Sequence, residues 1–138
     1  DAATERFHTL AGDIQQTEAE LSRVSDLMAA VVQYAKTRPA FDGYKAAKYS
    51  RKYLAEHEAE LVDYRAAKAT MAELLGGEKL PKMDVLKEKR RQLAAQKKAL
   101  YTKYRSAQEE MRQAVAVKAN IDHLLGVTDG QRKKEQER

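Results

Sequence analysis

Apolar residues recur every three or four positions through most of this chain, which is the spacing of one face of an α-helix. Over residues 4–37 they keep a seven-residue repeat with two apolar positions, the pattern of a coiled-coil seam. The seam consists of Phe7, Leu10, Ile14, Leu21, Val24, Met28, Val31 and Ala35. Thr17 occupies the one polar position of the repeat. A helix of this length would extend about 50 Å and needs a partner that covers its apolar stripe.

Proline and serine mark the next two predicted helices. Pro39 disfavours helical geometry in the residue before it, so we expect the first helix to end near residue 38. The same proline suits the first turn of a short helix over residues 39–48. Ser50 is a suitable N-cap for a third helix over residues 51–75.

Glycines mark the ends of the third and fourth predicted helices. The Gly76–Gly77 pair suits the left-handed conformation that follows a helix. Pro81 precedes a last predicted helix over residues 82–125, which Gly126 closes. The apolar stripe of this helix consists of Leu86, Leu93, Leu100, Tyr104, Ala107, Met111, Ala114, Ile121 and Leu125.

These lengths predict an all-α fold. The connection over residues 76–80 is short, so the third and fourth helices should be antiparallel neighbours. We expect the first and last helices to be antiparallel as well, with Phe7 and Leu10 near Ile121 and Leu125. The result is an elongated antiparallel coiled-coil hairpin of two long helices, thickened to a three-helix bundle at one end, over residues 1–127. The charged tail, residues 128–138, has no periodicity and is expected to be disordered.

Composition narrows the class of protein. The 138 residues suit one domain, and 34% of them are charged. The absence of Cys excludes a disulfide scaffold and thiolate chemistry, and it favours a reducing, cytoplasmic compartment. No apolar run approaches the roughly 20 residues that cross a bilayer, so we expect no membrane insertion. The chain begins at Asp1 without a Met, and we expect it to be part of a longer protein.

Catalytic motifs are not evident. His57 has no second His four residues later, so the zinc-protease signature is absent, and Gly76–Gly77 lacks the remainder of a phosphate-binding loop. We interpret His57 as a partly buried residue on a helix. We expect no catalytic, cofactor-binding or metal-ligating residues, and therefore no enzyme within this chain.

The distribution of charge along the chain indicates a function more clearly than these motifs do. The net charge is +5, but residues 79–105 hold ten bases against two acids, a net charge of +8. A basic stretch that comes first along the chain, residues 44–53, interleaves bases with tyrosines and contains no acid. Basic side chains neutralise phosphates and tyrosines stack on unpaired bases. The candidate nucleic-acid-binding residues are Lys45, Lys48, Tyr49, Arg51, Lys52, Lys87, Arg90, Arg91, Lys97, Lys98 and Tyr101.

In the predicted topology both stretches lie towards the same thick end of the hairpin. An alternative stays open, in which the tyrosines of these stretches belong to the core and the lysines form a solvated helix face. The tyrosines concerned are Tyr44, Tyr53 and Tyr104.

Several segments resemble the helical region that follows the nuclease domain of mobilisation relaxases, the DNA-nicking proteins of conjugative and mobilisable elements. The resemblance spans residues 14–126. Its most distinctive part is the pattern YRxAxxEMR over residues 104–112, followed by VKANID over residues 117–122. The segment YAKTRPAFDGYKAAKYSRKYLAEHEAEL, residues 34–61, and KLP, residues 79–81, also match.

This resemblance implies a coiled-coil module without catalytic residues. A relaxase nicks DNA with a Tyr and a metal held by a His cluster, and this chain has no such cluster. The resemblance and the basic stretches together predict a module that contacts DNA during conjugative DNA processing, with other mobilisation proteins as further partners. The alternative is a coiled-coil interaction, dimerisation or spacer module without nucleic-acid contact, in which Met83, Leu86 and Leu93 form the interface.

Overall fold

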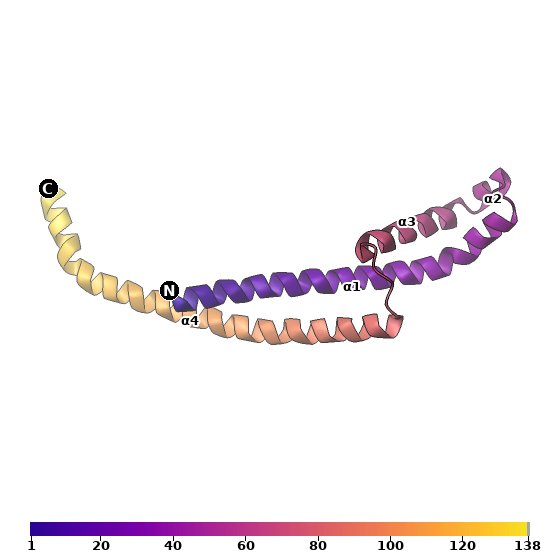
Figure 1. Ribbon diagram of the computed structural model, residues 1–138. Helices are drawn as coiled ribbons and strands as arrows, with labels where there is room; N and C mark the ends of the chain where they lie inside the picture. Colours follow the sequence, from indigo (N-terminus) through magenta and orange to yellow (C-terminus); the bar gives the residue numbers. More distant parts are fainter. Residues whose placement is uncertain (138) are drawn as a thin grey trace. The chain divides into compact units, whose positions relative to one another are not determined.

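The chain is all-α in a computed structural model that describes the backbone of residues 1–137 and the side chains of residues 1–126. Four helices follow one another along the chain (Figure 1). They are α1 (Ala2–Ala46), α2 (Arg51–Glu56), α3 (Glu58–Leu75) and α4 (Met83–Glu137). No strand occurs in the backbone described, which confirms the predicted fold class.

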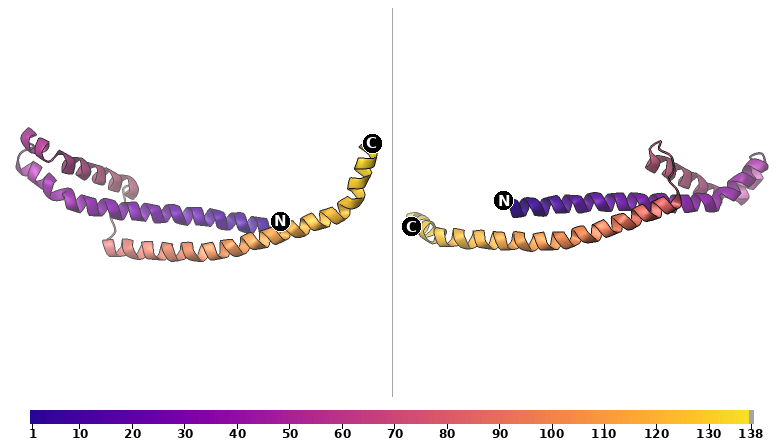
Figure 2. Two further views of the ribbon diagram at one scale, coloured as in Figure 1. Left: turned by 180° about the vertical axis from the view of Figure 1, so that it is seen from behind. Right: turned by 60° about the horizontal axis from the view of Figure 1, so that its bottom comes forward.

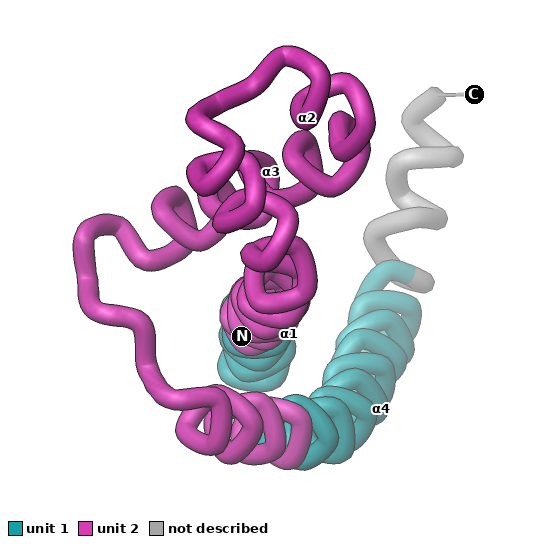
Figure 3. Tube along the Cα trace, turned by 90° about the vertical axis from the view of Figure 1, so that its right-hand side faces the viewer, with its two compact units in different colours: residues 1–16, 96–138 teal, residues 17–95 magenta. Residues whose placement is uncertain are grey.

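The chain divides into two compact units, and each contains part of α1 and part of α4 (Figure 3). Unit 1 comprises residues 1–16 and 96–138, and unit 2 comprises residues 17–95. Each unit has its own buried side chains, so each is described separately.

In unit 1 the start of α1 packs on α4. The rings of Phe7 and Tyr104 lie 4.9 Å apart between centroids, and the guanidinium of Arg6 contacts the carboxylate of Glu110 at 2.9 Å. Ala107 is completely buried, and Leu10 is buried in the same unit. Small and apolar seam positions therefore allow the two helices to approach closely.

The predicted register in unit 1 is wrong. Phe7 lies against Tyr104, about two heptads before the expected partner Ile121, which is half exposed. The N-terminus accordingly lies beside α4 well before the end of that helix (Figures 1 and 2). Because a heptad repeat matches equally well after each shift of seven residues, sequence periodicity does not select one register.

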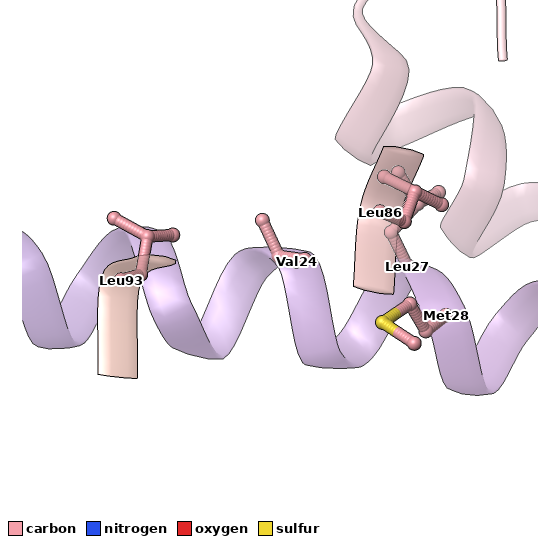
Figure 4. Close-up of a cluster of buried hydrophobic side chains, with 5 residues drawn as sticks. All are labelled: Val24, Leu27, Met28, Leu86 and Leu93. Carbon is pink, nitrogen blue, oxygen red and sulfur yellow. The ribbon is translucent and has the colours of Figure 1, made fainter. Parts of the chain in front are cut away.

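Unit 2 has an apolar core where α1 and α4 meet. Val24, Leu27 and Met28 of α1 are buried together with Leu86 and Leu93 of α4 (Figure 4). Side chains of α3 and its following loop pack against this cluster, among them Met71, Leu74, Leu75 and Leu80. Since Leu86 and Leu93 are buried within the chain, they do not form the exposed interface that the alternative interpretation assigned to them.

The predicted break at Pro39 does not occur, because α1 continues through it to Ala46. Pro39 leaves one backbone carbonyl without its usual donor, at a cost of about 3 kcal/mol. The Thr37 hydroxyl donates to the Gln33 carbonyl at 2.7 Å, a bond common where helices bend. Thr37 and Ala40 are both buried, so the packing of this helical face offsets the cost of the proline.

A tight corner joins α1 to α2. The backbone N–H of Tyr49 donates to the Tyr44 carbonyl, and that of Lys48 donates to the Lys45 carbonyl, which together form a Schellman motif. Ser50 caps α2 as predicted, because its hydroxyl accepts from the Tyr53 N–H at 3.4 Å. The corner therefore fixes the direction in which α2 leaves α1.

The predicted third helix is divided at His57. This residue lies between α2 and α3 with φ −121° and ψ 23°, outside helical geometry. The rings of His57 and Tyr53 stack at 4.1 Å, and the side chain is partly buried, in agreement with its sequence interpretation. Gly76 ends α3 in the left-handed conformation, φ 56°, which confirms its predicted role.

The last helix passes through Gly126 rather than ending there. A glycine inside a helix costs only about 1 kcal/mol, which the length of α4 tolerates. The predicted disordered tail, residues 128–138, lies outside the residues whose side chains are described, and it stays a prediction.

Candidate nucleic-acid interface

The first basic stretch forms the corner between α1 and α2. Lys48 and Tyr49 both have left-handed backbones, with φ 53° and φ 60°. A residue with a side chain rarely adopts this conformation, which costs on the order of 1 kcal/mol or more. The Schellman hydrogen bonds hold this backbone in place, which fixes the direction of the Cα–Cβ bond at both residues.

The tyrosines of this corner separate into two kinds. The Tyr53 hydroxyl donates to the Ala40 carbonyl at 2.7 Å, and its ring stacks near Tyr44 at 6.0 Å. Both rings are half-buried, which supports the core interpretation for them. Tyr49 is 58% exposed and meets Tyr44 edge-on at 5.2 Å. Tyr49 is therefore the tyrosine of this corner whose ring is available to a ligand.

The four bases of the corner are exposed, namely Lys45, Lys48, Arg51 and Lys52. The Lys45 ammonium lies 5.8 Å from the centre of the Phe41 ring, which is a cation–π distance. The acid nearest before this stretch, Asp42, lies 3.9 Å from Arg38. The corner thus carries four positive charges with no ion pair among its described side chains.

In unit 2 the second basic stretch occupies the first turns of α4. Lys87, Arg90 and Arg91 are all exposed. The Arg91 guanidinium donates twice to Glu88, at 2.6 and 3.0 Å. These hydrogen bonds lower the pKa of the Glu88 carboxyl and raise the pKa of Arg91. The charge of Arg91 is therefore partly balanced, and Lys87 and Arg90 are the more available bases.

In unit 1 the stretch continues along α4. Lys98 is exposed and Lys97 is half-buried. The Tyr101 ring is half-buried and lies 6.2 Å from the Tyr104 ring, so it is a poorer stacking surface than the ring at the corner.

Two further bases belong beside these candidates. Arg105 and Arg112 follow Lys98 at intervals of seven residues and are exposed. Residues seven apart lie on one side of a coiled-coil helix, about 10.5 Å from each other. We call Lys98, Arg105 and Arg112 the basic row. The spacing of seven is visible in the sequence. Arg105 is the last residue of the basic stretch, and Arg112 lies beyond it, after the acids Glu109 and Glu110.

Within unit 2 the two basic stretches do not meet. Leu86 packs in the cluster that contains Met28, whereas Lys45 lies seventeen residues further along α1. Seventeen residues of helix correspond to about 25 Å. The expectation that both stretches lie towards one end is therefore wrong, because α4 begins beside the middle of α1 rather than beside its end (Figure 1).

The side chains described contain no group of three His, Asp or Glu residues that could hold a metal ion. His57 lies 4.0 Å from Glu60, and both belong to the surface of one helix start. No helix of the described residues is long and apolar enough to span a membrane.

No protein-family model, curated protein or solved structure matches this chain.

Proposed function

We propose that this chain is a non-catalytic helical module that contacts DNA through exposed basic side chains, in a relaxase-like mobilisation protein of the cytoplasm. The observation that carries the proposal is the basic row on α4, three exposed bases on one side of one helix. The predicted hairpin, thickened to three helices at one end, remains part of this proposal.

The basic row is suited to a phosphate backbone. None of its members has an ion pair among the described side chains. On this side of the helix Tyr101 and Thr102 lie between Lys98 and Arg105 and carry no charge, whereas Gln108 and the acid Glu109 lie between Arg105 and Arg112. A spacing of about 10.5 Å corresponds to the rise of about three base pairs, 3.4 Å each, along the axis of a DNA duplex. Three bases at this spacing can each neutralise one phosphate and release its counterions.

The corner between α1 and α2 supplies a second contact. Its four exposed bases supply the charge, and the Tyr49 ring supplies a flat surface for an unpaired base. Such contacts depend on charge and ring area rather than on base identity. We therefore expect binding that depends strongly on salt and weakly on sequence.

Fluorescence anisotropy of a labelled oligonucleotide across a salt series tests this function. The triple variant Lys98→Gln, Arg105→Gln, Arg112→Gln removes the basic row. For double-stranded DNA, it should lower the slope of log affinity against log salt by about 2.7, and by about 2 for a single strand.

The matched control neutralises three exposed bases of unit 2 that lie outside both stretches, Lys36, Arg65 and Lys68. It changes the net charge equally and should leave most of the slope unchanged. Equal losses in the two triple variants would show that only net charge matters. No binding by the parent chain at low salt would end the proposal.

A further inference from the structure

One segment of α4 in unit 1 exposes apolar side chains in an unusual concentration. Nine large hydrophobic residues are strongly exposed in the described part of the chain, and five of them lie within residues 115–125. These five are Val115, Val117, Ile121, Leu124 and Leu125, with exposures between 50% and 72%. We call residues 114–126 the apolar segment.

The apolar segment continues the seam that α1 covers. Among the described residues of unit 1, Arg6 of α1 contacts Glu110 of α4, and the Phe7 ring lies against the Tyr104 ring. Ile121 and Leu125 keep the seam spacing beyond these contacts, but no described residue of unit 1 covers them.

Charged residues are also scarce in the apolar segment. Residues 113–126 contain one Lys and one Asp, whereas the preceding fourteen residues contain five charged side chains. A solvated helix face normally carries charge, and the core of an interface lacks it. The apolar segment therefore has the composition of a surface that another helix covers.

We propose that a second copy of this chain covers the apolar segment, with the two segments antiparallel about a two-fold axis near Asn120. In that arrangement Lys118 of one copy lies opposite Asp122 of the other, and the pair occurs twice by symmetry. A parallel pairing would instead place Lys118 beside its own copy in the seam, where like charges repel.

The charge balance favours a copy over other occupants. The segment itself is neutral, so two copies meet there without the repulsion that their net charge of +5 causes elsewhere. A nucleic acid would find one base in this segment, Lys118. Two helices in contact over about 20 Å bury on the order of 1,000 Å², at the low end for a specific interface. The dimer is accordingly weak and depends on concentration.

Sedimentation equilibrium of the 138-residue chain, from about 1 μM to 1 mM, tests this proposal. The mass should rise from 15.6 kDa towards twice that value as concentration increases. Ile121→Asp should keep the mass at 15.6 kDa across the range. The matched control, Val32→Asp, adds the same charge at a side chain that is 59% exposed in unit 2, and it should dimerise like the parent. Circular dichroism of both variants shows whether the helices are retained.

A charge exchange tests the antiparallel pairing. Lys118→Asp and Asp122→Lys should each weaken the dimer about threefold, and the double exchange should restore it. A parent chain that stays monomeric throughout overturns the proposal. So does a dimer that Val32→Asp abolishes and Ile121→Asp does not, or one that the double exchange fails to restore.

Discussion

Replacing Leu86 with alanine should destabilise unit 2 strongly, whereas the same truncation at its neighbour Val85 should not. The Leu86 side chain is 3% exposed and packs in the cluster that contains Leu27 and Met28. Val85 is 55% exposed. The pair therefore compares a buried and an exposed apolar position one residue apart on the same turn of helix.

The magnitude follows from the atoms removed. Leucine to alanine removes three carbon groups, worth about 2.4 kcal/mol of transfer free energy at about 0.8 kcal/mol each. A cavity adds to this loss, but the cluster borders partly exposed residues that can move into the space, so we expect about 3 kcal/mol in total. Helix propensity changes little, since alanine and leucine are both good helix formers. The exposed Val85→Ala should change the free energy of unfolding by no more than about 0.5 kcal/mol.

Thermal unfolding followed by far-ultraviolet circular dichroism measures the difference. For 138 residues, an unfolding entropy of about 2.1 cal/mol/K per residue converts 3 kcal/mol into a fall in Tm of about 10 °C. The fall should be the same at every protein concentration, because the cluster lies within one chain. Equal shifts for both variants, or a shift for Leu86→Ala that depends on concentration, would refute the assignment of Leu86 to the core.

Three further outcomes follow from local geometry. Lys48→Gly should stabilise the chain by about 1 kcal/mol in urea unfolding, because glycine adopts φ 53° without strain; destabilisation would contradict the Schellman corner. Gly43→Ala should destabilise the corner by about 1–3 kcal/mol, because its Cβ would collide with the ring of a neighbouring tyrosine. Gly12→Ala, whose Cβ meets nothing within 4 Å, should stabilise α1 slightly and serves as its control. Arg91→Gln should raise the pKa of Glu88 towards its ordinary value in an NMR titration. Because the folded pKa is lowered, the small stabilisation from this pair is present above the ordinary pKa and disappears as the pH falls through the folded value; an unchanged titration would exclude the pair in solution.

The sequence predicted each site residue from residue type, but it did not predict availability. Tyr49 and Tyr53 are both tyrosines in one basic stretch, yet one ring is exposed and the other is held by a hydrogen bond to Ala40. Arg91 and Lys98 are both bases on α4, yet only Arg91 has a carboxylate partner among the described side chains. Such differences depend on rotamers and neighbours, which residue type alone does not specify.

Periodicity by itself determined that this chain is helical and which stripe of each long helix is apolar, because a spacing of three and four residues matches one face of a helix. Local chemistry determined the caps at Ser50 and Gly76, since these depend on residues adjacent in the chain. Tertiary structure alone decided that α1 continues through Pro39, where the burial of Thr37 and Ala40 outweighs the local preference of proline. It also decided the register of α1 on α4, because a seven-residue repeat is unchanged by a shift of seven residues, and only the packing of particular side chains distinguishes one shift from the next.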